Sequence, residues 1–393
     1  MIVPGVGKAP CAEARDRDRP SRRRAQGQAS AAMEKPWLGG VQPMTQVLYH
    51  RRSRPCRATP NPQEPTVSSQ TMTVIEMREA GGPEVLVPGR RPVPSPAAGE
   101  VLLRVIAAGV NGPDLVQRRG HYPPPKGASD LLGLEVAGAV VALGEGVTRW
   151  QVGQTLVALT NGGGYAEFVA VDADHCRPLP EGVDPVDAAG LPETLFTVWS
   201  NVFHGAHIAD GAVFLVHGGA GGIGSTAIQL GAAMGLRVFT TVASAEDAAF
   251  CEGLGAERAI RFAEEDFVPV LREAGGADII LDIIGGDYVA RNIKATRHDA
   301  RLIMLAFNKG SKVEVDLMPV MLKRLTLTGS TLRSRSAAFK AEVAVALTEH
   351  VWPLFAAGRL RPVTHTVLPL AEAASAHALM ESAQHRGKIL LKP

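Results

Sequence analysis

The sequence predicts an α/β protein in which a β-rich region is followed by a doubly wound parallel sheet. Three observations predict this fold: short strand-like runs separated by Pro and Gly up to residue 184, alternating helix and strand patterns after it, and a glycine-rich turn between one such strand and its helix. The chain has 393 residues, of which 46% are hydrophobic and 20% charged, as in folded globular proteins. No apolar run approaches the roughly 20 residues that a membrane span needs, so we expect no membrane protein.

The first 71 residues differ from the rest in composition. They hold 12 basic and five acidic residues, including the run Arg22-Arg23-Arg24, and show no sustained apolar periodicity. Such a segment has too little apolar surface to fold, so we expect a disordered basic tail over residues 1–71. It would be a passive tail or the product of an upstream start, with a targeting segment or an RNA-binding arm as alternatives. The remainder is slightly acidic, which makes nucleic-acid binding by the body of the protein unexpected.

The cysteines indicate the compartment. They are far apart in the chain and form no C-x-x-C pair, which fits a reducing environment, so we expect the cytoplasm. A disulfide scaffold and a cysteine-cluster zinc site are excluded. The four positions are Cys11, Cys56, Cys176 and Cys251.

The β-rich region is predicted from short runs of β-branched and aliphatic residues. These runs cover residues 73–77, 101–107, 135–143, 155–159 and 165–171.

The elements become longer from residue 185 onward. Predicted helices cover residues 185–205, 225–234, 245–254, 287–295 and 336–356. Predicted strands cover residues 213–216, 238–242, 279–282, 301–305, 325–332 and 388–391. Strands that alternate with helices of about ten residues indicate βαβ units and therefore a parallel sheet.

The motif that carries most information joins the first of these strands to its helix. The segment reads Val213-Phe-Leu-Val-His-Gly-Gly-Ala-Gly-Gly-Ile-Gly224, with glycines at intervals of three. A dinucleotide diphosphate binds where free N–H groups and the helix dipole favour negative charge, and a β-carbon on the turn would hold it away. We therefore predict a Rossmann domain with a bound dinucleotide; a turn used only for packing is the alternative. The predicted contacts are Gly218, Gly219, Ala220, Gly221, Gly222, Ile223 and Gly224.

The end of the second strand distinguishes NAD from NADP. An acid there binds the ribose hydroxyl of NAD, whereas basic residues bind the 2′-phosphate of NADP. The strand ends at Ser244, which suits a phosphate, but Glu246 and Asp247 follow and would repel one unless they point away. The pattern favours NADPH, with NADH as the alternative.

Several segments of residues 72–393 together resemble one family. They are Ala108-Gly-Val-Asn-Gly-Pro-Asp114 with Arg119-Gly-His-Tyr122, Gly133-Leu-Glu-Val-Ala-Gly138, Gly162-Gly-Gly-Tyr-Ala-Glu167, the glycine turn, Leu281-Asp-Ile-Ile-Gly-Gly286 and Gly387-Lys-Ile-Leu-Leu391. In this order they resemble the zinc-free quinone oxidoreductases of the medium-chain dehydrogenase/reductase superfamily, the group of zeta-crystallin.

The resemblance implies the domain plan. A GroES-like catalytic domain would be formed by residues 72–197 and 337–393, with the Rossmann domain over residues 198–336 between them. It also implies a homodimer that pairs through the strand at 325–332. Zinc-dependent relatives hold their metal with a cysteine near residue 108 and a histidine directly before Glu135, where this chain has Ala108, Gly109 and Leu134. We therefore expect no metal.

The implied activity is the transfer of hydride from NADPH to a quinone or related conjugated carbonyl, which accepts it without a strong Lewis acid. Reduction of enoyl thioesters or other enones by the same fold is the alternative. An RNA-binding protein that uses the basic tail is the alternative from another class.

The resemblance also transfers individual residues. Asn111, Asp114 and Tyr122 fall on the substrate side, with Tyr122 as the donor that orients a quinone oxygen. Alternatively, Asn111 and Asp114 only shape a helix start and Tyr122 only packs. Thr197 falls near the nicotinamide, or is simply a buried threonine.

The remaining implied cofactor contacts are Ser244, Leu305, Phe307 and Lys388. In NADPH-using relatives a lysine and a tyrosine accompany the serine at the phosphate, but this chain has Asp247 and Phe262 at those places. The resemblance still favours NADPH, and it leaves NADH open.

Overall fold

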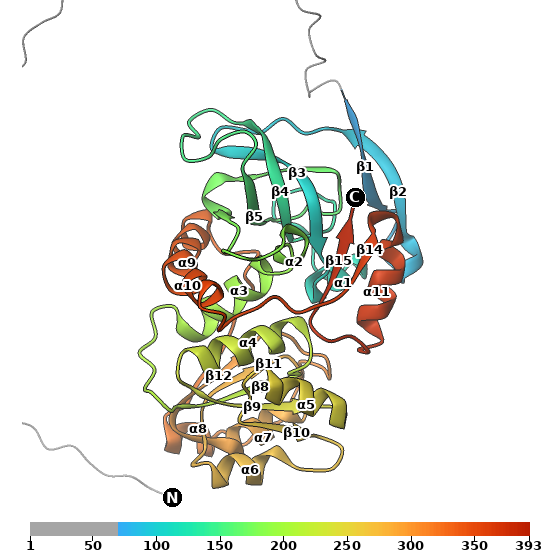
Figure 1. Cartoon of the computed structure of the whole chain (residues 1–393). Helices are drawn as coiled ribbons and strands as arrows, with labels where there is room; N and C mark the ends of the chain where they lie inside the picture. Colours follow the sequence, from blue (N-terminus) through green and yellow to red (C-terminus); the bar gives the residue numbers. More distant parts are fainter. Residues whose placement is uncertain (1–69) are drawn as a thin grey trace, which may run out of the picture. The chain divides into compact units, whose positions relative to one another are not determined.

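A computed structural model describes residues 70–393 (Figure 1). The predicted tail therefore lies outside the described residues, except for its last two. The first strand begins at Thr71, one residue before the predicted start of the domain. Within the described range, no helix is long and apolar enough to cross a membrane.

The β-rich domain is built around one mixed sheet. A separate hairpin pairs β1 (Thr71–Met77) with β2 (Leu86–Pro92). The strand order of the main sheet is β14-β15-β3-β4-β5-β7, with β6 also paired to β3. Its strands are β3 (Glu100–Gly109), β4 (Glu135–Leu143), β5 (Thr155–Leu159), β6 (Phe168–Asp172), β7 (Cys176–Pro178), β14 (Thr364–Pro369) and β15 (Lys388–Lys392). Because β15 pairs antiparallel with β3, the end of the chain completes the domain that its beginning started.

The second domain is a six-stranded sheet in which every neighbouring pair is parallel. Its strand order, β10-β9-β8-β11-β12-β13, is that of a doubly wound dinucleotide-binding fold, with the order reversing between β8 and β11. The strands are β8 (Val213–His217), β9 (Arg237–Val242), β10 (Arg258–Arg261), β11 (Ala277–Asp282), β12 (Thr296–Met304) and β13 (Thr326–Gly329). The predicted Rossmann domain is confirmed.

Helices pack against both sheets and lie between the two domains (Figure 1). They are α1 (Gly112–Arg118), α2 (Pro185–Ala188), α3 (Pro192–Val198), α4 (Gly222–Ala233), α5 (Ala245–Gly253), α6 (Phe267–Glu273), α7 (Tyr288–Ala295), α8 (Met318–Lys323), α9 (Ala337–His350), α10 (Trp352–Ala356) and α11 (Ala373–Glu381). One hydrophobic cluster runs through both domains, because it includes Val157 of β5, Phe196 of α3 and Phe214 of β8. The two sheets therefore share a core.

Two predicted helices are interrupted. The helix expected over 185–205 divides into α2, α3 and a π turn (Trp199–Phe203), and Pro192 occupies the first turn of α3. Similarly, the helix expected over 336–356 divides at Val351, and Pro353 opens α10. Proline lacks the N–H that a continuing helix needs, so each proline starts a new helix instead.

Two predicted strands are shorter than expected. The strand over 325–332 is formed only by Thr326–Gly329, where β12 supplies a partner. The strand over 165–171 begins at Phe168, because Tyr165 uses its carbonyl to bond Ile75 of the hairpin instead of entering the main ladder. The strands β2, β7, β10 and β14 and the helices α6, α8 and α11 were not predicted from the sequence.

Candidate cofactor and substrate site

The predicted cofactor residues gather at one edge of the parallel sheet. The glycine turn follows β8, Ser244 follows β9, and Leu305 and Phe307 follow β12. Since the carboxyl ends of parallel strands share one edge, the topology brings these positions together at the point where the strand order reverses. In this fold that edge is where a ligand binds.

The turn between β8 and α4 accepts glycine alone at several positions. Gly218 has φ 75°, and a β-carbon on Gly219 would lie 2.2 Å from Thr240 Oγ1. A β-carbon on Gly224 would lie 2.2 Å from the carbonyl oxygen of Gly218. Gly221 differs, because its nearest neighbour would be 3.8 Å away. The restriction at Gly219 holds the turn close to β9, and the restriction at Gly224 holds the start of α4 close to the turn. The space at Gly221, in contrast, lies open.

The open space faces the start of α4. Gly221 is the N-cap residue of this helix, and no side chain in the described part of the chain caps the first amides. Amides left free at a helix N-terminus bind phosphate oxygens, so the residues present fit the diphosphate of a dinucleotide. The C-terminal segment supports the turn, since Gly387 N–H donates to the carbonyl of Ala220 at 2.7 Å.

The residues after β9 begin helix α5, and an arginine pairs with an aspartate in its first turn. Ser244 Oγ accepts a hydrogen bond from the N–H of Asp247 at 3.1 Å, which makes Ser244 the N-cap of α5. The carboxylate of Asp247 in turn accepts from Arg386 Nε at 2.7 Å. Arg386 comes from the C-terminal segment beside the glycine turn. A guanidinium group therefore reaches the first turn of α5, the helix that Ser244 caps, although the expected lysine is absent and Phe262 is half exposed.

Asn111 and Asp114 lie at the start of α1, where they make structural contacts. The N–H of Asn111 donates to Asp114 Oδ2 at 2.9 Å, and the N–H of Gly133 donates to Asp114 Oδ1 at 3.0 Å. Burial raises the pKa of Asp114 to about 6. These bonds shape the start of α1, as the structural alternative for Asn111 and Asp114 predicted. A role of the two residues toward a substrate stays a prediction.

A buried ion pair joins the beginning and the end of the catalytic domain. Lys388 Nζ lies 2.6 Å from Glu135 Oε1 and 2.5 Å from Asn111 Oδ1. Asn111 Nδ2 donates to the same Glu135 oxygen at 2.9 Å, while Glu193 N–H donates to the other at 2.8 Å. The Lys388 ammonium is thus bonded to protein atoms. The stem of Lys388 faces the turn, since its Cδ would lie 2.8 Å from a β-carbon on Gly222.

Tyr122 lies next to two charged side chains. The guanidinium carbon of Arg333 is 5.6 Å from the centre of its ring. Burial raises the pKa of the Tyr122 hydroxyl, and the charge of Glu193 adds to this increase. The hydroxyl therefore keeps its proton at neutral pH and is available as a hydrogen-bond donor. Thr197 is buried one turn further along α3 from Glu193.

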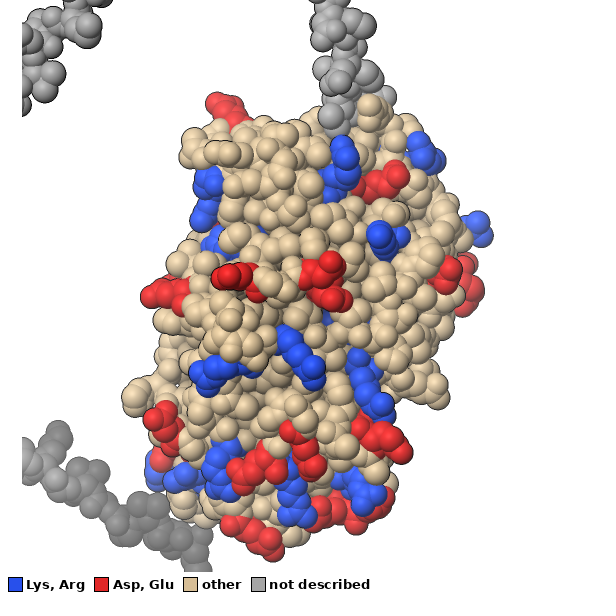
Figure 2. Space-filling model, viewed as in Figure 1, with Lys and Arg blue, Asp and Glu red and all other residues tan. Residues whose placement is uncertain are grey.

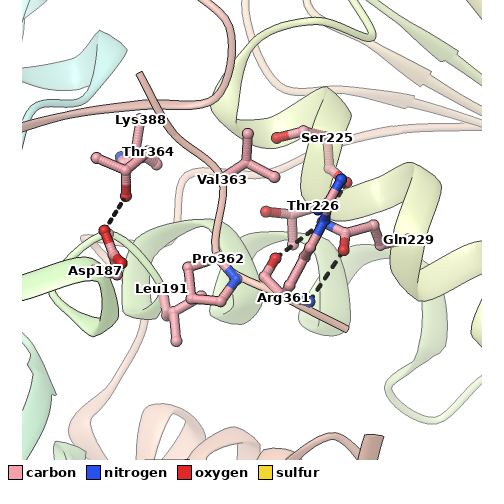
Figure 3. A pocket seen from close by; sticks show the side chains of 11 residues that line it. Asp187, Leu191, Ser225, Thr226, Gln229, Arg361, Pro362, Val363, Thr364 and Lys388 are labelled. Atoms are coloured by element: carbon pink, nitrogen blue, oxygen red, sulfur yellow. Dashed lines mark hydrogen bonds between the residues drawn. The ribbon is translucent and has the colours of Figure 1, made fainter. Parts of the chain in front are cut away.

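A small cavity between the domains lies beside this site (Figure 3). Thr364 Oγ1 donates to Asp187 Oδ1 at 2.7 Å, and Gln229 exchanges two hydrogen bonds with the backbone of Arg361. These bonds fix residues 361–364 against α2 and α4. The cavity has a volume of about 10 Å³, which is room for one water molecule and not for a cofactor.

The sequence analysis missed three residues of this region. Glu135 was noted only as the neighbour of an absent zinc ligand, Glu193 only as part of a long helix, and Arg386 not at all. Pro192 before Glu193 was a usable signal, because proline followed by an acid is typical of a first helical turn. No local signal pointed to Arg386, since its partner Asp247 is far away in the sequence. Within residues 70–393, no group of three or more His, Cys, Asp or Glu side chains is placed to hold a metal ion.

Comparison with known proteins follows this division into domains. The alcohol dehydrogenase GroES-like domain family matches residues 97–181, and the zinc-binding dehydrogenase family matches residues 222–348. The quinone oxidoreductase of Rattus norvegicus is 31% identical over 327 residues, which are 81% of this chain and 97% of the rat protein. A mycocerosic acid synthase-like polyketide synthase of Mycobacterium tuberculosis is 30% identical over 304 residues, which are 75% of this chain but 14% of that enzyme.

A solved structure shows the same arrangement. The quinone oxidoreductase of Escherichia coli, crystallised with NADPH, has a TM-score of 0.74 and 28% identity, and the match covers 82% of this chain and 100% of that one. The fold and the glycine turn thus define a reductase of the medium-chain dehydrogenase/reductase class. Within this class, the chain belongs to the quinone oxidoreductase family.

Proposed function

We propose that the protein binds NADPH and uses it to reduce a quinone or a related conjugated carbonyl. The observation that carries this proposal is the glycine turn, whose uncapped amides and open space at Gly221 fit a dinucleotide diphosphate. The NADPH-bound relative with the same fold supports the choice of cofactor. When bound, the cofactor supplies hydride from its nicotinamide ring. The protein positions both reactants, excludes water and donates a hydrogen bond to the acceptor oxygen.

Tyr122 is the proposed donor of that hydrogen bond. The change Tyr122→Phe is expected to lower kcat with a quinone about tenfold or more, because the developing oxygen charge loses a donor. The affinity for NADPH should stay the same, since Tyr122 lies away from the glycine turn in sequence and domain. Steady-state kinetics and a fluorescence titration with NADPH measure the two quantities. Wild-type quinone kinetics in the Phe variant would refute the role.

Arg386 is the proposed ligand of the 2′-phosphate, in place of the missing lysine. The change Arg386→Ala is expected to weaken NADPH binding about tenfold and to leave NADH binding unchanged, because a charge-assisted hydrogen bond of about 1.5–3 kcal/mol is lost. The exposed Arg359, changed to Ala, is the control. Titration with each cofactor decides the point. Equal loss of NADPH and NADH affinity would show that Arg386 supports only the turn.

Reduction of enoyl thioesters is a second candidate, favoured by the similarity to part of a polyketide synthase. Rates on a quinone and on an acyl-CoA enone separate the two.

RNA binding by residues 1–71 is tested by salt-dependent RNA retention that is lost when these residues are deleted. On the visible face of the folded part, acidic and basic side chains are interspersed, so nothing there favours a nucleic-acid partner (Figure 2).

We further propose that catalysis does not need zinc. This is supported by Lys388, whose ammonium group is itself the cation bonded to Glu135 and Asn111. Full activity after dialysis against a chelator is the expected result.

The cytoplasm is the proposed location, because Cys176 and Cys251 are free and buried, as in proteins of reducing compartments. Cell fractionation would test it.

We also propose a homodimer formed at the edge strand β13. This strand ends the parallel sheet, and an exposed apolar surface lies beside it on and before α8. The surface consists of Leu317, Met318, Met321 and Leu322, each more than half exposed. An unpaired edge next to exposed apolar side chains is a typical dimer surface. Sedimentation that gives the mass of a single chain would refute the proposal.

A further inference from the structure

Glu193 is a buried carboxyl group without a cation of its own. It lies in the first turn of α3 and is 9% exposed. Its backbone N–H donates to Glu135 Oε2, and the charge of Glu135 acts on the Glu193 carboxyl group, but the ammonium of Lys388 pairs with Glu135. Within the described part of the chain, Glu193 makes no ion pair with any Lys, Arg or His. Two buried carboxyl groups that share one cation favour a neutral, protonated form for the unpaired one.

The other nearby cations are engaged elsewhere. Lys340 Nζ donates to Asn161 Oδ1 at 2.7 Å and to the carbonyl of Arg333 at 2.9 Å. The guanidinium of Arg333 donates to the carbonyl of Asn161 and to the side chain of Gln117. Consistent with this, burial raises the pKa of Glu193 to about 8, and the charge of Glu135 adds to the increase. We therefore expect Glu193 to carry a proton at neutral pH.

Arg333 links Glu193 to the proposed substrate ligand, because its guanidinium carbon lies 5.6 Å from the centre of the Tyr122 ring and it interacts electrostatically with both Tyr122 and Glu193. After burial, the charge of Glu193 is the next largest cause of the raised pKa of Tyr122. We propose that Glu193 is the proton donor of the reaction, while Tyr122 orients the substrate oxygen beside it. This proposal rests on the proposed quinone reduction. Tyr122 itself suits the first role less well, because its raised pKa makes it a weak acid at neutral pH.

Reduction of a quinone by hydride consumes one proton. Hydride brings two electrons and one hydrogen to the quinone and leaves a hydroquinone anion, which needs one proton. The O–H bond of Glu193 breaks, and a new O–H bond forms on the substrate oxygen. The Glu193 carboxylate then takes a proton from solvent before the next turnover. An acid whose pKa lies near the working pH is suited to both halves of this cycle.

The groups that set this titration come from several elements. They are Glu135 on β4, Lys388 on β15, Asp114 on α1, Lys340 on α9 and Tyr122 after α1. The reaction requires the protonated form of Glu193. We therefore expect wild-type kcat to be constant at acidic pH and to fall as the pH rises through about 8.

The test replaces Glu193 with its neutral isostere. Glu193→Gln is expected to lower kcat with a quinone about 100-fold and to abolish the decline above pH 8, while NADPH affinity stays within about twofold. The exposed Glu181, changed to Gln, is the matched control. Wild-type kcat and an unchanged pH profile in the Glu193→Gln enzyme would overturn the inference. Failure of the wild type to oxidise NADPH with any quinone would instead refute the proposed function.

Thermal unfolding gives a second readout. The folded protein holds the Glu193 proton more tightly than the unfolded chain, so wild-type stability is lost as the pH rises toward and through about 8. The Glu193→Gln variant has no such loss. It should unfold at a higher temperature than the wild type at pH 9 and at a similar one at pH 5. An equal difference at both pH values would show that Glu193 is not neutral in the fold, against the proposal.

Discussion

The change Lys388→Met is expected to lower the free energy of unfolding by about 3–5 kcal/mol, because it leaves a buried carboxylate without its cation. Lys388 and Glu135 are both buried, and Lys388 also donates to Asn111 and to the carbonyl of Val110. Methionine replaces the stem but none of these bonds. The pair joins β15 to β4, so its loss weakens the attachment of the C-terminal segment to the catalytic domain.

Denaturant unfolding at neutral pH measures this effect. The exposed Lys392 on the same strand, changed to Met, should alter stability by less than about 0.5 kcal/mol and serves as the control. The double variant Lys388→Met with Glu135→Gln should recover part of the loss, because the uncompensated charge is gone. A single Lys388→Met variant within about 1 kcal/mol of the wild type would show that the pair contributes no net stability.

The second large effect concerns the glycine turn. The change Gly221→Ala should raise the Kd for NADPH about 100-fold, which corresponds to about 2.7 kcal/mol, while the melting temperature stays unchanged. The reason is that a β-carbon on Gly221 meets no protein atom closer than 3.8 Å and its φ of −74° suits alanine. The methyl group would instead occupy the space proposed for the diphosphate. Cofactor titration and thermal unfolding measure the two quantities.

A neighbouring glycine provides the contrast. In Gly224→Ala the β-carbon would lie 2.2 Å from the carbonyl oxygen of Gly218, so the fold itself should lose about 1–3 kcal/mol or more. Gly253→Ala, at the end of α5 with nothing within 4 Å, is the neutral control. Unchanged NADPH affinity in the Gly221→Ala variant would contradict the placement of the diphosphate and the proposed function with it.

Local patterns were sufficient for much of the Rossmann domain. The strand before the glycine turn, the helix after it and the next strand were predicted within a few residues of β8, α4 and β9. They were predictable because apolar periodicity and glycine spacing act over short stretches of chain. The break in the helix predicted over 185–205 also had a local signal, Pro192, but the continuous apolar pattern around it favoured one long helix.

The candidate site was predictable only in part. The sequence pointed to Ser244 and Asp247 as conflicting signals for a phosphate. In the structure, Arg386 pairs with Asp247 and so neutralises the acid that would repel a phosphate. Glu193 carried no special signal, because a carboxyl group is made unusual by what surrounds it and not by its own segment.

The sequence by itself determined the α/β class, the glycine turn and the family, since each is recognised from short segments, taken in their order along the chain. Only the tertiary structure decided that β15 returns to β3, that Lys388 neutralises Glu135 and that Glu193 forms no ion pair among residues 70–393. These features depend on burial and on charges brought together from distant segments. A charge acquires its protonation state from its neighbours in space, and the order of the residues does not specify those neighbours until the chain has folded.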